Sequence, residues 1–157
     1  MKKLMLFVLM NALLMLNNEA FAQIKKTFES TTFSKGDIIR VPNIEVELLN
    51  SEKDVKNDSL ESLANFLISH PDLKVEIGCY TESKGNLAGN KAASQYRAQG
   101  IRDYLIKNKG IAQERLTAKG YGKSKLLVSD AMIAAAKTKE EKERLTLMNR
   151  RIELLVL

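Results

Sequence analysis

The sequence predicts an α/β or α+β protein in which helices cover a single sheet. Three observations predict it: short segments with apolar residues at every second position, amphipathic segments of helical period between them, and an apolar run at the end of the chain. With 157 residues, of which 45% are hydrophobic and 28% charged, the chain has the size and composition of one globular domain. The expected order is strand, helix, strand, helix, strand, a further helix and a last strand.

The first strand and the first helix are expected in the first half of the chain. Apolar residues alternate with glutamates in the segment 38–48, and Pro42 predicts a bulge or an edge position there. Asp58, three residues before Glu61, resembles the N-cap of a capping box, and Pro71 ends the helix because the residue before a proline disfavours helical backbone. The helix face expected to be buried carries Leu60, Leu63, Ala64 and Leu67.

A second strand and a long helix follow. Apolar and charged residues alternate over residues 73–77, which predicts a short half-buried strand that runs into the polar segment 78–90. The helix is expected over residues 87–107, and Gly110 provides C-terminal cap chemistry. Its expected buried face carries Ala93, Tyr96, Gly100, Ile101, Tyr104 and Leu105.

The last third of the chain predicts two more strands and a charged helix. Residues 115–119 are expected to form a short strand, which Gly120 and Gly122 break with a turn. Residues 130–146 are rich in alanine, lysine and glutamate, so we expect a solvated helix that is a surface insertion. The apolar run 152–157 fits a buried central strand better than an edge strand.

The first 22 residues resemble a signal peptide. Two lysines precede a 13-residue apolar run, and Ala20-Phe21-Ala22 forms a cleavage site with small residues. The alternative, a membrane anchor, fits less well because a spanning helix needs about 20 apolar residues. We therefore expect an exported chain with a flexible leader at residues 23–34, one domain over residues 35–157, and no transmembrane segment after cleavage. Gln23 would follow the cleavage site, so a lipid anchor on an N-terminal cysteine is not expected.

Composition narrows the possible chemistry. One cysteine (Cys79) and one histidine (His70) cannot form an internal disulfide or a structural zinc site, and we expect no metal and no cofactor. Nothing near His70 in the chain is typical of a nucleophile or a metal ligand, so an enzyme is not expected. The formal net charge of +6 favours acidic partners, but export and the scattered basic residues argue against nucleic acid. A free thiol in an oxidising compartment is expected to be buried.

One segment is a candidate binding site. Residues 78–85 leave a strand and enter a helix, a position that suits ligands in open sheets and anions at helix N–H groups. Glu82 lies in this loop, and Arg97 follows fifteen residues later in the helix. Opposite charges held apart suit a zwitterionic ligand, whose carboxylate would meet the guanidinium and whose ammonium group would meet the carboxylate of Glu82. The alternative is a plain surface ion pair between the two side chains.

The same segment begins a resemblance that extends over residues 35–157. The chain is similar to the OmpA-like C-terminal domain family in three ordered motifs. These motifs are Cys79-Tyr80-Thr81-Glu82 with Gly85, Asn90 and Ala93-Ser94-Gln95-Tyr96-Arg97-Ala98; Gly110-Ile111 with Arg115-Leu116 and Gly120-Tyr121-Gly122; and Asn149-Arg150-Arg151-Ile152-Glu153. The resemblance implies an α+β fold of order β-α-β-α-β-(α)-β, with a mixed four-stranded sheet and helices mainly on one face.

The resemblance also implies a set of site residues. Members of the family grip the diamino-acid stem peptide of peptidoglycan without a covalent bond, and the positions carried over are Glu82, Arg97, Thr81, Asn90 and Arg150. Three positions depart from the family pattern. Glu82 stands where the family has Asp, Cys79 where it has Gly, and Tyr80 where it has His.

The function that the resemblance implies is non-catalytic binding of peptidoglycan in the periplasm, which would link envelope components to the cell wall. Further partners would be proteins of the outer membrane or the periplasm. The alternative is an OmpA-like scaffold with a degenerate wall site that acts as a protein–protein interaction module in the envelope.

Overall fold

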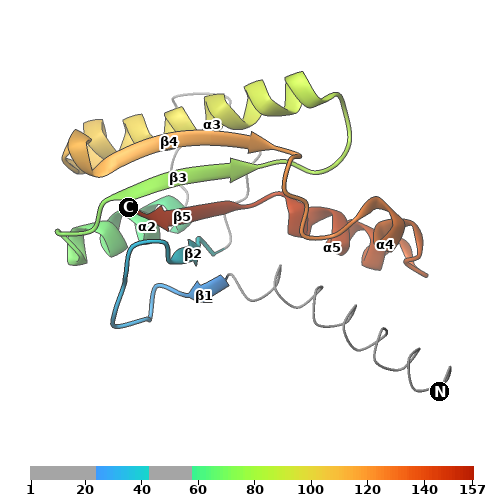
Figure 1. Ribbon diagram of the computed structural model, residues 1–157, viewed down its shortest axis with the longest axis horizontal. Helices are drawn as coiled ribbons and strands as arrows, with labels where there is room; N and C mark the ends of the chain where they lie inside the picture. Colours follow the sequence, from blue (N-terminus) through green and yellow to red (C-terminus); the bar gives the residue numbers. More distant parts are fainter. Residues whose placement is uncertain (1–23, 43–57) are drawn as a thin grey trace, which may run out of the picture.

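The computed structural model describes residues 24–42 and 58–157, which form a five-stranded sheet with helices packed against it (Figure 1). The strands are β1 (Ile24–Lys26), β2 (Ile38–Arg40), β3 (Val75–Tyr80), β4 (Leu116–Gly122) and β5 (Ile152–Val156). The helices are α2 (Asp58–Ser69), α3 (Leu87–Lys109), α4 (Asp130–Ala134), α5 (Lys139–Asn149) and the short 3-10 helix η2 (Gln113–Arg115). The expected signal peptide and residues 43–57, which include part of the expected first strand, lie outside the described residues.

The sheet is mixed, as predicted. Its strands lie in the order β1-β2-β5-β3-β4, with β3 parallel to β4 and β5 antiparallel to both of its neighbours. The apolar run at the end of the chain forms the central strand β5, whose Ile152, Leu154 and Val156 are buried in the core. The α+β class and the four expected strands are confirmed, and β1 adds a fifth strand next to β2.

Residues 24–34, the described part of the expected flexible leader 23–34, contribute to this fold. Ile24–Lys26 pair with β2, and the rings of Phe28 and Phe33 lie 4.5 and 5.4 Å from the ring of Phe66 on α2. The polar composition of the stretch predicts a leader, but its two aromatic side chains bury enough apolar surface to hold it against α2.

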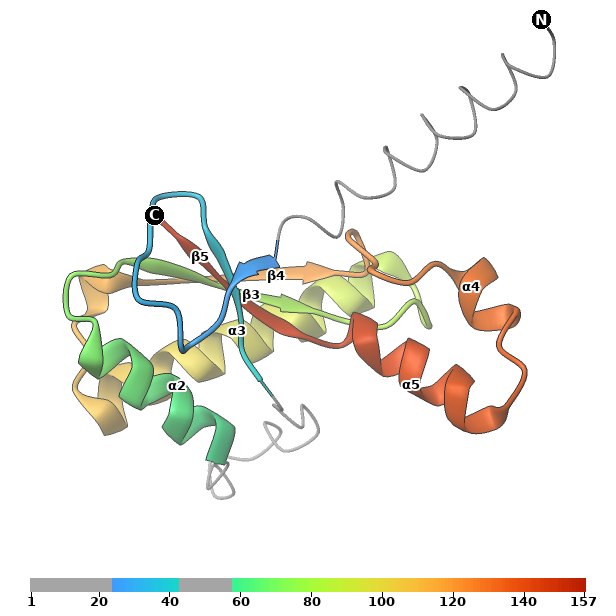
Figure 2. The same ribbon diagram turned by 90° about the horizontal axis from the view of Figure 1, so that it is seen from below.

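Helices α2 and α3 cover one face of the sheet, whereas α4 and α5 extend beyond its end (Figure 2). The predicted face of α2 is correct, because Leu60, Leu63, Ala64 and Leu67 are all at most 1% exposed. Helix α2 ends at Ser69, just before Pro71, and Gly110 closes α3 with a left-handed φ of 66°. Both helix ends therefore follow from the local sequence.

Arg115 fastens the end of α2 to the beginning of β4. Its Nε donates to the carbonyl oxygen of Leu73 at 2.9 Å. Its Nη2 donates to the carbonyl oxygens of Leu67 and His70, both at 2.8 Å. The last carbonyls of a helix have no helical partner, so this guanidinium satisfies them and ties α2 to the sheet.

The predicted face of α3 is wrong over the first half of the helix. The buried residues are Ser94, Ala98, Ile101 and Leu105. The expected core residue Tyr96 is 65% exposed. The reason is that polar side chains of α3 face the outer edge of β4. Gln95 Nε2 donates to the carbonyl oxygen of Ala118 at 3.2 Å, and the Gly120 N–H donates to Gln95 Oε1 at 2.8 Å. Apolar periodicity cannot predict a helix face that contacts the sheet through hydrogen bonds.

The expected turn at Gly120 and Gly122 is also wrong, since β4 continues through both residues. A Cβ at Gly120 would lie 2.2 Å from the backbone nitrogen of Gln95. Gly122 has a φ of +55°, and a Cβ there would lie 2.9 Å from the backbone nitrogen of Lys91. The two glycines therefore serve the close approach of α3 to the strand and not a change of chain direction.

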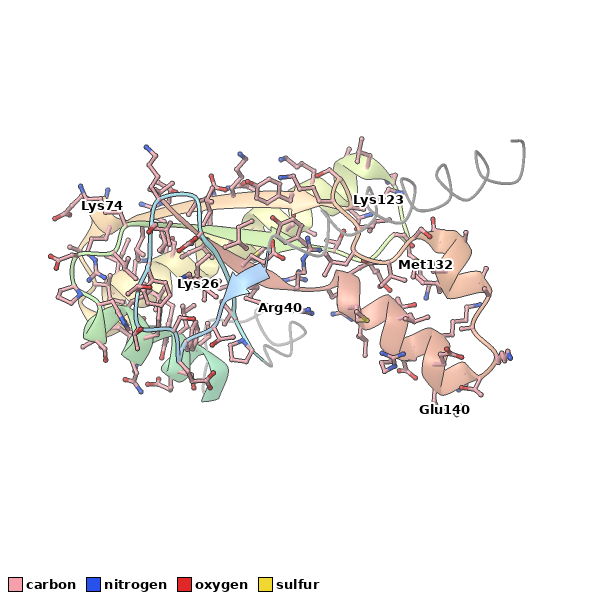
Figure 3. All side chains as sticks on the ribbon, turned by 60° about the horizontal axis from the view of Figure 1, so that its bottom comes forward. Lys26, Arg40, Lys74, Lys123, Met132 and Glu140 are labelled. Atoms are coloured by element: carbon pink, nitrogen blue, oxygen red, sulfur yellow. The ribbon has the colours of Figure 1, made fainter. Side chains whose placement is uncertain are left out.

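The expected helix over residues 130–146 is split into α4 and α5. Ser129 accepts a hydrogen bond from the N–H of Met132, and Thr138 accepts one from the N–H of Glu141, so each helix begins at its own N-cap. Most of their residues are exposed, as expected for a surface insertion. Figure 3 shows Met132 and Glu140 on this projecting pair of helices, well away from Lys74 at the other end of the molecule.

We expect Gly120→Ala to lower the free energy of unfolding by about 3 kcal/mol, because the added methyl group meets the backbone of α3 and not a flexible side-chain tip. Gly100→Ala is the matched control. Nothing lies within 4 Å of a Cβ at that exposed position of α3, so alanine should stabilise the helix by about 0.5–1 kcal/mol. Urea unfolding of both variants measures the difference, and a Gly120→Ala variant as stable as the unchanged chain would contradict the close packing.

Candidate functional site

The predicted site residues meet at the end of the sheet where β3 and β4 finish and β5 begins. Thr81 and Glu82 directly follow β3, and Arg150 lies two residues before β5. The backbone of Tyr80 donates to the carbonyl oxygen of Arg151 at 3.0 Å, which holds these two segments side by side. Figure 1 shows the loop into α3 and the junction of α5 with β5 at this same end.

The loop between β3 and α3 is held by side chains from three positions. Thr81 is buried. Its N–H donates to the carbonyl oxygen of Gly122 at 3.0 Å, and its side-chain Oγ1 donates to the carbonyl oxygen of Glu82, also at 3.0 Å. Asn90 Nδ2 donates to the carbonyl oxygen of Lys84 at 2.7 Å. Thr81 and Asn90 thus shape the loop through its backbone.

Lys123 is a third support of this loop and is not among the site residues predicted from the sequence. Its Nζ donates to the carbonyl oxygens of Ser83 at 3.0 Å and Gly85 at 2.7 Å. Figure 3 places Lys123 beside the beginning of α3. The only signal in the sequence is a basic residue directly after the Gly120-Tyr121-Gly122 motif, and a lysine that binds carbonyl oxygens has no pattern of its own.

Arg97 presents a cationic group that the described part of the chain does not satisfy. The side chain is half-buried, and its Nη1 is buried with no hydrogen-bond partner among the described residues. Burial lowers the pKa of the Arg97 guanidinium, the neighbouring Cys79 thiol raises it, and the positive charge of Arg150 lowers it again. An arginine nevertheless stays protonated in proteins. The site therefore contains a charged donor that lacks an acceptor.

Glu82 is partly exposed in the loop that follows β3. Among the described residues, no ion pair joins its carboxylate to the guanidinium of Arg97. The two opposite charges are therefore available to different groups of a ligand. The positive charge of Arg150 is near enough to lower the pKa of Arg97, and two such cations favour an anion at this side of the site.

Cys79 is completely buried on β3, as the sequence analysis expected of the thiol. Burial raises the pKa of the Cys79 thiol to about 12, an effect that the nearby Arg97 guanidinium only partly opposes. The thiol is therefore neutral at physiological pH. It is part of the hydrophobic core next to Arg97, as a small apolar group and not as a nucleophile.

The backbone around Arg150 is fixed by its two neighbours. Asn149 is fully buried, and its Oδ1 accepts hydrogen bonds from the N–H groups of Leu127 at 2.7 Å and Val128 at 2.9 Å. On the other side, the Arg151 guanidinium lies 3.7 Å from the ring centroid of Tyr80 and its Nε binds Glu153 Oε1 at 2.7 Å. Of this motif only Arg150 is a site residue predicted from the sequence, although its neighbours determine where its backbone lies.

The sequence and the fold are both similar to those of known proteins. The sequence profile of the OmpA family matches residues 51–143, more than half of the chain. The chain belongs to the OmpA family. It is 40% identical over 82 residues to outer membrane porin F of Pseudomonas fluorescens, which is 52% of this chain and 23% of that protein. It is 36% identical over 67 residues to the peptidoglycan-associated lipoprotein of Buchnera aphidicola, which is 43% of this chain and 38% of that protein.

Two solved structures share the fold of this OmpA-family chain. The periplasmic domain of MotB from Helicobacter pylori is 15% identical with a TM-score of 0.55, and the match covers 80% of this chain and 78% of that one. The cell wall anchor of the type VI secretion system (T6SS) from Pseudomonas aeruginosa is 23% identical with a TM-score of 0.52, covering 76% and 78%. These likenesses show the fold alone. The curated relatives are longer proteins, of which the chain spans less than half.

Within residues 24–42 and 58–157, no helix is long and apolar enough to cross a bilayer. The same residues contain no group of three or more histidine, cysteine, aspartate or glutamate side chains that could hold a metal ion.

We expect the Cys79 thiol to react with iodoacetamide at pH 8 about 1,000-fold more slowly in the folded chain than in the chain unfolded by denaturant. The reason is that the pKa is raised from 9.0 to about 12, and the reactive thiolate becomes tenfold rarer with each pH unit. Mass spectrometry of timed samples measures both rates. Rapid labelling of the folded chain would show that Cys79 is accessible and would contradict its place in the closed core.

Proposed function

We propose that this OmpA-family chain binds peptidoglycan non-covalently, through the diamino-acid residue of the stem peptide, and performs no catalysis. The observation that carries the proposal is the buried Nη1 of Arg97, which has no hydrogen-bond partner among the described residues. An unsatisfied charged donor is costly. A ligand carboxylate, which can accept two parallel hydrogen bonds from a guanidinium, would remove that cost.

The second half of the proposed recognition is the ammonium group of the same amino acid. The Glu82 carboxylate lies in the loop after β3 and has no ion pair with Arg97, so it is free to attract a cation. A diamino acid offers a carboxylate and an ammonium group at one end, which matches this pair of opposite charges. Thr81 and Asn90 support the loop, and Arg150 adds positive charge beside Arg97.

The relatives support the same class of function. One is named a peptidoglycan-associated lipoprotein and a structural neighbour is described as a cell wall anchor. For this chain we propose export by a signal peptide at residues 1–22, a domain at residues 35–157, and a place in the periplasm between the cell wall and envelope proteins. Shared fold is not sufficient for this conclusion, because function depends on the site.

A second candidate function is an interaction module without wall binding. The α4–α5 pair favours it, because Met132 and Leu147 on these helices are 51% and 50% exposed. Large apolar side chains on a projecting element are a common feature of contact surfaces. This candidate does not require Arg97 or Glu82, so the two functions respond differently to substitution at the site.

We expect Arg97→Ala to weaken binding to purified sacculi by about 10- to 100-fold, since hydrogen bonds to a charged group contribute about 1.5–3 kcal/mol. Co-sedimentation measures the bound fraction. Arg144→Ala, which removes the same charge from an exposed position on α5, should bind like the unchanged chain.

Glu82→Gln should separate the two halves of the recognition. It should weaken binding of a soluble diamino-acid stem peptide and leave binding of the same peptide without its side-chain ammonium group unaffected. Calorimetric titration measures both. Binding that neither Arg97→Ala nor Glu82→Gln alters would contradict the proposed site, and a chain that does not sediment with sacculi at all would favour the interaction module.

A further inference from the structure

A second hollow lies at the other end of β4, away from the proposed peptidoglycan site. It has a volume of about 540 Å³ and is lined by Arg102, Gln113, Glu114, Leu116, Thr117 and Ala118. Strand β4 runs from Leu116 to Gly122, so the hollow lies where the strand begins and the proposed site where it ends. At about 3.3 Å per residue, the two places are roughly 20 Å apart.

The hollow exposes a short piece of unpaired strand edge. β4 is the last strand of the sheet, and Gln95 of α3 occupies its outer edge at the Ala118 carbonyl and the Gly120 N–H. Both backbone groups of one residue point to the same side of a strand, and this side alternates along the chain. The N–H of Ala118 and the carbonyl of Leu116 therefore also point outward, and among the described residues no side chain of α3 forms a hydrogen bond with them as Gln95 does with the next pair.

Arg102 lies on the same flank of α3, seven residues or about two turns beyond Gln95. Its Nε is buried and has no hydrogen-bond partner among the described residues. A buried donor on a charged group is costly to leave unsatisfied. Ser94 and Gln95 thus form hydrogen bonds with the edge of β4, whereas Nε of Arg102 remains without a partner among the described residues.

We propose that this hollow binds an extended peptide segment that ends in a free carboxylate. The main chain of the peptide would pair with the Ala118 N–H and the Leu116 carbonyl, as in strand addition, and its carboxylate would accept from Arg102. Arg102 is the one basic residue in the lining and Glu114 the one acidic residue, so the lining has no net charge. The single guanidinium of Arg102 matches a single carboxylate, and the negative charge of Glu114 disfavours phosphate groups and other multiply charged anions.

The proposal is tested with the exported chain and two probes, acetyl-Ala-Ala-Ala with a free carboxylate and the same peptide with a C-terminal amide. Nitrogen-15 NMR titration should show shifts of the Leu116 and Ala118 amide signals with the free acid. The amide should bind at least about 10-fold more weakly, because it lacks the charged acceptor for Arg102.

Two substitutions sharpen the test. Arg102→Gln should weaken binding of the free acid about 10-fold or more, whereas Lys107→Gln, which removes a positive charge from an exposed position of the same helix, should not. Arg102→Lys keeps the charge but not the planar fork and should give an intermediate affinity. Dispersed spectra confirm that each variant is folded.

Three results would overturn the proposal: no shifts at residues 116–118, equal binding of acid and amide, or equal weakening by Lys107→Gln. Shifts confined to the surroundings of Arg97 would assign the peptide to the proposed wall site. Because Arg97→Ala removes only that site, binding of the probe to the Arg97→Ala variant distinguishes failure of this proposal from failure of the proposed function.

Discussion

The contact between α3 and β4 at Gly120 determines where the functional side chains of this molecule lie. Because β4 has no Cβ at this position, the backbone of the helix can come so near that any side chain would collide with the Gln95 nitrogen. At that separation Ser94 and Gln95 reach the edge of the strand with hydrogen bonds. The position of α3 along its axis is then fixed, and with it the place of Arg97 near Cys79.

The parts of the fold that the sequence predicts well are those held by apolar contact alone. The buried face of α2 and the central strand β5 follow from simple periodicity, since their neighbours are side chains of the core. The sequence predicts poorly those parts in which polar side chains contact the sheet through hydrogen bonds. The first half of α3 presents a serine and a glutamine to the sheet, and a hydropathy pattern assigns such residues to solvent. The sequence also does not predict that β4 continues through Gly120 and Gly122. Whether a glycine marks a turn or a close contact depends on which part of the fold lies next to it.

The candidate site shows a similar division. Arg97 and Glu82 could be identified from motif spacing, and the structure adds that Nη1 of Arg97 has no acceptor in the described part of the chain. That fact depends on three-dimensional distances and no pattern contains it. Lys123 could not be identified, and Asn149 belongs to a motif that does not reveal its role, because both residues act on carbonyl oxygens and N–H groups, which every residue has. Motifs thus locate the groups that could meet a ligand, while the groups that hold them in place become visible only in the fold.

Gln95 has a consequence for how copies of this protein behave toward one another. Its side-chain amide supplies the outer edge of β4 with a donor and an acceptor in the way that a neighbouring strand would. Uncovered edge strands are templates on which other chains can add, and they lead to aggregation at high concentration. β4 is the edge strand on the side of the sheet opposite β1, and the Gln95 carboxamide covers this edge between the Ala118 carbonyl and the Gly120 N–H. The solubility of the folded domain in a crowded compartment therefore depends in part on one uncharged side chain that belongs to neither the core nor the candidate site.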